Sequence, residues 1–141
     1  MNYYIDGVWL DRKLDEQYPN QMYRGLIPTL VPWLDREDEK EVVWRRIIPG
    51  EGETKICPIL MCPEDNDFSC TLIVAEIKNC GDTIQWQRVG LDKTSEWEAE
   101  KVGTIVEWFD KINNLVFSKN EYLLMINNFK QFLFDQKNIE Q

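Results

Sequence analysis

The sequence contains no histidine. Without an imidazole, the chain cannot form a Ser-His-Asp triad, a Cys-His pair, a histidine-ligated zinc site or a histidine pH switch. It also has neither a P-loop nor a G-x-G-x-x-G turn, the glycine-rich motifs that bind phosphates. We therefore expect the protein not to be an enzyme, although a hydrolase that uses a pair of carboxylates stays open as a lower alternative.

Basic residues are scarce relative to acidic ones. The 141 residues include 16 lysines and arginines against 25 aspartates and glutamates, a formal net charge of −9. Nucleic-acid binding needs a basic surface, so we expect no nucleic-acid partner. The longest apolar runs fall short of the 18 residues of a membrane span, and residues 1–6 lack the basic and apolar regions of a signal peptide. We expect a cytoplasmic protein without a membrane partner.

The four cysteines lack the spacing of a metal site. Cys57, Cys62, Cys70 and Cys80 contain no C-x2-C pair, and no histidine is present to complete a ligand set. We expect no metal or other cofactor. The cysteines are interpreted as free thiols of the core and strands, with a redox pair as the alternative.

The remaining composition is that of one folded domain. Hydrophobic residues make up 43% and charged residues 29%, and the 7 glycines and 6 prolines do not gather into a linker. Internal repeats are absent. We expect a single domain over residues 1–141, in which residues 135–141 form a frayed tail.

Alternation and apolar runs predict an antiparallel sheet. Residues 68–78 have an almost continuously apolar middle, typical of a central strand covered on both faces. Pro58 suggests an edge position or a bulge in its strand. Residues 26–34 are expected to be extended along the edge of the core, with or without a short edge strand. Residues 11–22 are expected to form a loop or short helix, and residues 35–41 a solvated turn or a short helical turn. The predicted strands are residues 3–10, 42–48, 54–62, 68–78, 83–91 and 104–109.

The C-terminal region carries a clear helix start. Ser118 and Glu121 have the spacing of a capping box, and Phe117 and Tyr122 that of a hydrophobic staple. Apolar residues then recur at helical spacing. The predicted fold is therefore α+β, an antiparallel meander with a C-terminal helix packed on one face.

Acidic residues are concentrated in segments 35–41 and 64–67. One interpretation is solubility. The alternative is a decoy surface that docks onto the basic, phosphate-binding site of a partner such as a nuclease. For segment 64–67, carboxylate catalysis and calcium binding are lower alternatives, since the ligand spacing of an EF-hand is missing. The candidate partner-binding acids are Asp35, Glu37, Asp38, Glu39, Glu41, Glu64, Asp65 and Asp67.

Six tryptophans provide a second set of candidates. Trp9, Trp44, Trp86 and Trp108 fall in predicted strands and are expected to pack on the sheet. Trp33 and Trp97 lie in more polar surroundings, where an exposed aromatic anchor for a protein partner is favoured. The i, i+2 spacing of Trp86 with Arg88, and of Trp44 with Arg46, would place each pair on one strand face suited to recognition.

Several short motifs suggest a family. They are CPEDNDFSC at 62–70, IVAE at 73–76, IQWQRVGLD at 84–92 and VEWFD at 106–110. Across roughly residues 60–130 the chain resembles small bacterial proteins found among the immunity proteins of polymorphic toxin systems. The resemblance implies a cytoplasmic antitoxin that binds and neutralises a cognate protein toxin. Its motifs are structural, so it assigns no binding residue.

Two kinds of function thus stay open. The leading hypothesis is a non-enzymatic immunity protein whose acidic loops, with Trp33 and Trp97, bind a toxin. The alternative is a small-ligand-binding or scaffold domain with an aromatic-lined cavity.

Overall fold

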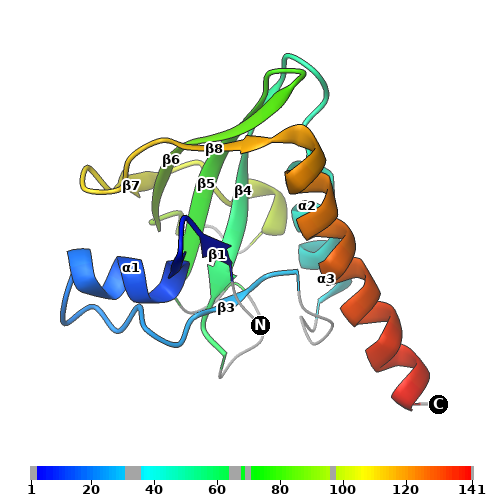
Figure 1. Cartoon of the computed structure of the whole chain (residues 1–141). Helices are drawn as coiled ribbons and strands as arrows, with labels where there is room; N and C mark the ends of the chain where they lie inside the picture. The colour runs from blue at the N-terminus through cyan, green and yellow to red at the C-terminus, as the bar shows by residue number, and fades with distance from the viewer. Residues whose placement is uncertain (1–2, 31–35, 64–67, 69–70, 96–97, 141) are drawn as a thin grey trace.

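An antiparallel β-sheet forms the centre of the structure (Figure 1). The computed structural model describes residues 3–30, 36–63, 68, 71–95 and 98–140, with the backbone alone for residues 132–140. Within this part of the chain the sheet has six strands in the order β3-β4-β5-β6-β7, and β8 also pairs with β6. The strands are β3 (Ile27–Pro28), β4 (Thr54–Met61), β5 (Leu72–Asn79), β6 (Thr83–Asp92), β7 (Val106–Trp108) and β8 (Leu115–Ser118).

Strand β5 lies at the centre and is buried on both faces. Leu72, Ile73, Val74 and Ala75 are each at most 2% exposed, as expected for a continuous apolar run flanked by two strands. In β4 the register shifts between Pro58 and Leu60. The bulge predicted from this proline is therefore confirmed, and the Thr29 hydroxyl donates a hydrogen bond to the Pro58 carbonyl at 2.8 Å.

Helix α3 (Lys119–Glu140) contacts β6 and β8 on one side of the sheet (Figure 1). The backbone N–H of Glu121 donates to Ser118 Oγ at 3.1 Å, which confirms the predicted N-cap. The rings of Phe117 and Tyr122 lie 5.4 Å apart, which confirms the staple. The single α+β domain with an antiparallel meander and a C-terminal helix is thus as predicted. The helix continues to Glu140, through most of the expected frayed tail.

The N-terminal segment differs from its prediction. Residues 3–10 form a tight hairpin, β1 (Tyr4–Ile5) and β2 (Val8–Trp9), instead of one strand. Its turn residues Asp6 and Gly7 both have positive φ, 53° and 83°, the requirement of a type I′ turn that Asp-Gly satisfies well. Helix α1 (Leu10–Gln17) follows directly, one of the two alternatives expected for residues 11–22.

Helix α2 (Glu37–Arg46) begins within segment 35–41, where a short helical turn was one of the two alternatives, and it replaces the strand predicted at 42–48. Three acidic residues in its first turn and two arginines in its last turn complement the helix dipole. Val42 and Val43 are fully buried. An apolar run of this length suits a buried strand or a buried helix equally well, which explains the error.

The two predicted Trp–Arg pairs are not on common strand faces. Glu76 pairs with Arg88 and Ile77 with Trp86, so Gln87 is an extra residue in a β-bulge. Because Glu76 and Ile77 point to opposite faces, their partners do too. Trp44 and Arg46 lie in α2, where i, i+2 residues do not share a face.

Arg46 instead fastens α2 to the rest of the fold. Its guanidinium donates to the carbonyls of Ile56, Val102 and Glu100 at 3.1, 2.9 and 2.9 Å. These contacts hold α2 against β4 and the short helix η1 (Ala99–Lys101), which Figure 1 shows behind the sheet, away from β1.

Strand β8 was absent from the sequence-based prediction.

Candidate protein-binding surfaces

Four of the predicted partner-binding acids lie at the start of α2, within the part of the chain that the structure describes. The side chains of Glu37, Asp38 and Glu41 are 88%, 51% and 72% exposed. Each forms an exposed ion pair with a neighbour in sequence, respectively with Lys40, Arg36 and Arg45. Exposed single-contact pairs such as those of Glu37 and Glu41 contribute only about 0–1 kcal/mol, so these two carboxylates can exchange partners at little cost. Asp38 is held more firmly, because Arg36 donates to both of its oxygens, at 3.1 and 2.7 Å.

Glu39 differs from the three acids around it. It is only 4% exposed, and its Oε2 accepts a hydrogen bond from the backbone N–H of Phe68 at 3.2 Å. Its side chain therefore faces inward in the folded domain and is not part of the exposed acidic surface. Phe68 is the residue that directly follows the second acidic segment, so this bond brings the chain after segment 64–67 to the first turn of α2.

The other predicted contact residues lie outside the described part of the chain. They are Asp35, Glu64, Asp65, Asp67, Trp33 and Trp97. Among the predicted partner-binding acids that the structure describes, Glu37, Asp38 and Glu41 are the exposed ones, and we call these three the α2 acidic face.

Two of the tryptophans expected in the core, Trp86 and Trp9, differ in burial. Trp86 is fully buried, and its Nε1–H donates to the hydroxyl of Tyr122 at 3.3 Å, which in turn donates to the Ile47 carbonyl at 2.6 Å. Trp9, in contrast, is 38% exposed on the N-terminal hairpin and packs on Tyr4, with ring centroids 4.9 Å apart. The expectation of a core position is therefore wrong for Trp9.

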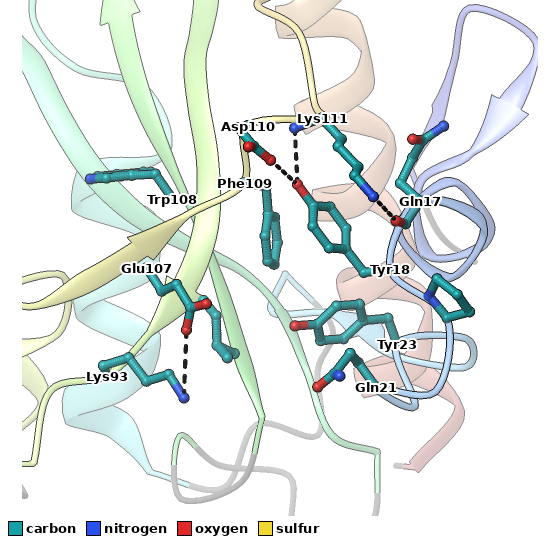
Figure 2. Close-up of a pocket in the computed structure, with 12 residues that line it drawn as sticks. Gln17, Tyr18, Gln21, Tyr23, Lys93, Glu107, Trp108, Phe109, Asp110 and Lys111 are labelled. Atoms are coloured by element: carbon teal, nitrogen blue, oxygen red, sulfur yellow. Dashed lines mark hydrogen bonds and ion pairs between the residues drawn. The ribbon is translucent and has the colours of Figure 1, made fainter.

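A pocket of about 580 Å³ opens beside β7 (Figure 2). Tyr18, Tyr23 and Phe109 form an aromatic cluster in its wall, with the Phe109 centroid 4.7 Å from Tyr18 and 5.6 Å from Tyr23. Local sequence patterns do not reveal this site, because its walls come from segments about 90 residues apart. The lining residues are Gln17, Tyr18, Pro19, Gln21, Tyr23, Leu91, Lys93, Glu107, Trp108, Phe109, Asp110 and Lys111.

One side of the pocket has its polar groups paired. The hydroxyl of Tyr18 donates to Asp110 Oδ1 at 3.1 Å and accepts the backbone N–H of Lys111 at 2.9 Å. The ammonium group of Lys111 donates to the Gln17 carbonyl at 3.4 Å and lies 5.3 Å from the centre of the Tyr18 ring. These contacts join the end of α1 to the chain after β7.

The same aromatic wall holds a second tyrosine, whose hydroxyl is available. Tyr23 is 4% exposed, and among the described residues its hydroxyl has no hydrogen-bond partner. Burial raises the pKa of Tyr23, and the nearby Glu107 carboxylate and Tyr18 raise it further. Figure 2 shows the hydroxyl pointing across the pocket toward the side where Glu107 and Lys93 lie, 3.8 Å apart as an ion pair.

Beside the pocket, Arg88 is held between two partners. Its guanidinium lies 4.0 Å from the Trp108 ring centre and forms two hydrogen bonds to the Glu76 carboxylate, at 2.6 and 3.3 Å. This arrangement shows that a planar cation is accommodated on an aromatic face of this sheet.

Cys57 is not an activated nucleophile. Burial raises the pKa of the Cys57 thiol, against the smaller effect of Arg46, so the thiol form dominates at neutral pH. Cys80 is exposed and carries a free thiol, whereas Cys70 lies outside the described residues. No group of three or more cysteine, aspartate and glutamate side chains in the described residues has a metal-binding arrangement. The helices described here include none with the length and apolarity needed to cross a bilayer.

Comparisons of the chain with models of known protein families, with curated proteins and with solved structures give no match. The resemblance to immunity proteins consequently stays a prediction, and the surfaces described above are the evidence for a function.

Proposed function

We propose that this chain is a non-enzymatic protein-binding domain, an immunity-type protein that acts in the cytoplasm and neutralises a cognate bacterial toxin. The partner's binding site is basic, as in a nuclease that must hold phosphates, and the α2 acidic face occupies it together with segment 64–67. No cofactor takes part.

The bond between Glu39 and Phe68 is the observation that carries this proposal. The proposed surface requires two acidic segments, more than 20 residues apart in the chain, to act on the same partner. The 3.2 Å contact ties the residue after the second segment to the helix that begins at the first. This contact supports the proposal that the two charge runs act on the same partner.

The charges suit rapid association with a basic partner. A net charge of −9 steers cationic surfaces toward the domain, and clustered carboxylates add specificity at close range. Glu37 and Glu41 are exposed and weakly paired, so a partner's arginines and lysines can replace their present ion-pair partners. Asp38 is exposed as well and adds a carboxylate that Arg36 holds in place.

A direct test uses the protein encoded by the neighbouring toxin gene. Cells that express this toxin should survive when the full chain is co-expressed, and the two purified proteins should form a complex in size-exclusion chromatography. Failure to bind and to protect against every toxin encoded beside it would contradict the proposal.

The second candidate, a small-ligand-binding domain, is favoured by the aromatic pocket beside β7. Its volume of about 580 Å³ falls within the range of small-molecule sites. A ligand that binds there while no toxin is recognised would favour this candidate over the first.

A further inference from the structure

The pocket beside β7 combines an aromatic wall with a carboxylate at its mouth. The rings of Tyr18, Tyr23 and Phe109 contact one another in series, and the Glu107 side chain is 66% exposed at the opposite side. Figure 2 shows Tyr23 and Glu107 on opposite sides of the same space. A group that enters therefore meets flat apolar surface, one hydroxyl and one carboxylate.

The available polar atoms determine which chemical groups of a ligand the pocket can bind. The Tyr23 hydroxyl can accept a hydrogen bond, and the Glu107 carboxylate can accept two in parallel. A guanidinium group supplies several N–H donors in one plane and stacks on aromatic rings, which an ammonium group does less well. The chain already stabilises such a group nearby, where Arg88 lies on Trp108 and bonds to Glu76.

Each of the two lysines in the pocket wall has a partner within the pocket. Lys111 is held by the Gln17 carbonyl and the Tyr18 ring. Lys93 forms an ion pair with Glu107 that is long, 3.8 Å, with both side chains more than half exposed. Such a pair is easily displaced by a bidentate partner. The net charge of −9 further disfavours an anionic ligand.

We propose that this pocket receives an arginine side chain of the protein partner, with its guanidinium bonded to Glu107 and the Tyr23 hydroxyl and stacked against the aromatic wall. This inference rests on the proposed function, because the arginine belongs to the bound toxin. It adds a second contact region beyond the α2 acidic face and names the residue type that this region recognises.

The site can be tested without the toxin. Nα-acetyl-arginine amide is titrated into the full chain, and two-dimensional NMR follows Tyr23, Phe109, Lys93 and the Trp108 indole. We expect saturable shifts at these residues, with at least about tenfold weaker binding of the uncharged analogue Nα-acetyl-citrulline amide. Equal binding of citrulline, tighter binding of Nα-acetyl-glutamate amide, or shifts confined to other regions would overturn the assignment.

Two variants and a matched control sharpen the test. Glu107→Gln should weaken the arginine probe about tenfold, and Tyr23→Phe should weaken it about threefold, because each removes an acceptor for the guanidinium. Glu53→Gln removes a carboxylate of similar exposure, 59% against 66%, that directly precedes β4, and it should leave binding unchanged. An unchanged affinity in Glu107→Gln, with native circular dichroism, would contradict the proposal.

Toxin binding separates this inference from the proposed function. If substitution of the α2 acidic face weakens the toxin complex while Glu107→Gln does not, the pocket assignment fails and the immunity function stands. If the arginine probe binds and no neighbouring toxin does, the immunity function fails and the guanidinium site stands.

Discussion

The carboxylate of Glu39 accepts the backbone N–H of Phe68 at 3.2 Å, across 29 residues of sequence. Glu39 is buried in the first turn of α2, whereas Glu37, Asp38 and Glu41 around it are exposed. One acidic residue thus anchors a distant part of the chain, and its neighbours remain available to a partner.

Replacement of Glu39 should therefore affect stability. We expect Glu39→Ala to lower the free energy of unfolding by about 1–3 kcal/mol, because the Phe68 N–H loses its acceptor. Glu39→Gln retains an acceptor oxygen and should cost less. Urea unfolding measures both values, and equal stability of the alanine variant and the wild type would show that this bond is unimportant.

The hydrogen-bond chain from Trp86 through Tyr122 to Ile47 should contribute strongly to stability. Tyr122→Phe keeps the ring but leaves the Trp86 N–H and the Ile47 carbonyl without this partner. We expect a loss of about 1–3 kcal/mol in urea unfolding. Tyr4→Phe is a matched control, since Tyr4 is 60% exposed, and it should change stability by less than about 0.5 kcal/mol.

Stability should fall at alkaline pH. Burial raises the pKa of Tyr3 and Tyr122 above the ordinary value of 10, so the unfolded chain releases these protons before the folded chain does. The stabilisation is fully present below pH 10 and is lost as the pH rises beyond it. Urea unfolding between about pH 8 and 11 should show this decline, with a smaller slope in Tyr122→Phe. A slope identical to that of the wild type would argue against a contribution from Tyr122.

The N-cap of α3 offers a local test. Ser118→Ala removes the acceptor for the Glu121 N–H and should lower the free energy of unfolding by about 1 kcal/mol. Ser95→Ala, at an exposed position outside the helices and strands, is the control and should have almost no effect. Equal losses in the two variants would mean that the cap itself contributes little.

Short-range signals explain what the sequence could predict. Ser118, Glu121, Phe117 and Tyr122 lie within six residues, and their capping and staple contacts depend only on local geometry. Pro58 likewise signals its bulge directly, because it cannot donate to the strand ladder. These features required no knowledge of the distant chain.

Tertiary context decided the features that were missed. The apolar residues at 42–44 suit a strand or a helix, and α2 forms because they pack on β4 while Arg46 reaches three carbonyls. The bulge at Gln87 has no residue signature and reverses the facing of Arg88. The pocket joins Tyr18 and Tyr23 to residues 107–111, and no local sequence pattern predicts this contact.

The central claim is that the α2 acidic face binds a basic toxin. The most direct measurement is the dissociation constant for the neighbouring toxin by calorimetry, at about 50 and 300 mM NaCl. It compares the wild type with Glu37→Gln/Asp38→Asn/Glu41→Gln and with the control Glu51→Gln/Glu53→Gln/Asp82→Asn, which has the same change in charge.

We predict that the α2 variant binds about tenfold or more weakly at low salt and loses most of the salt dependence, while the control changes affinity less than about threefold. Equal affinities of the two variants at about 50 mM NaCl would contradict the claim.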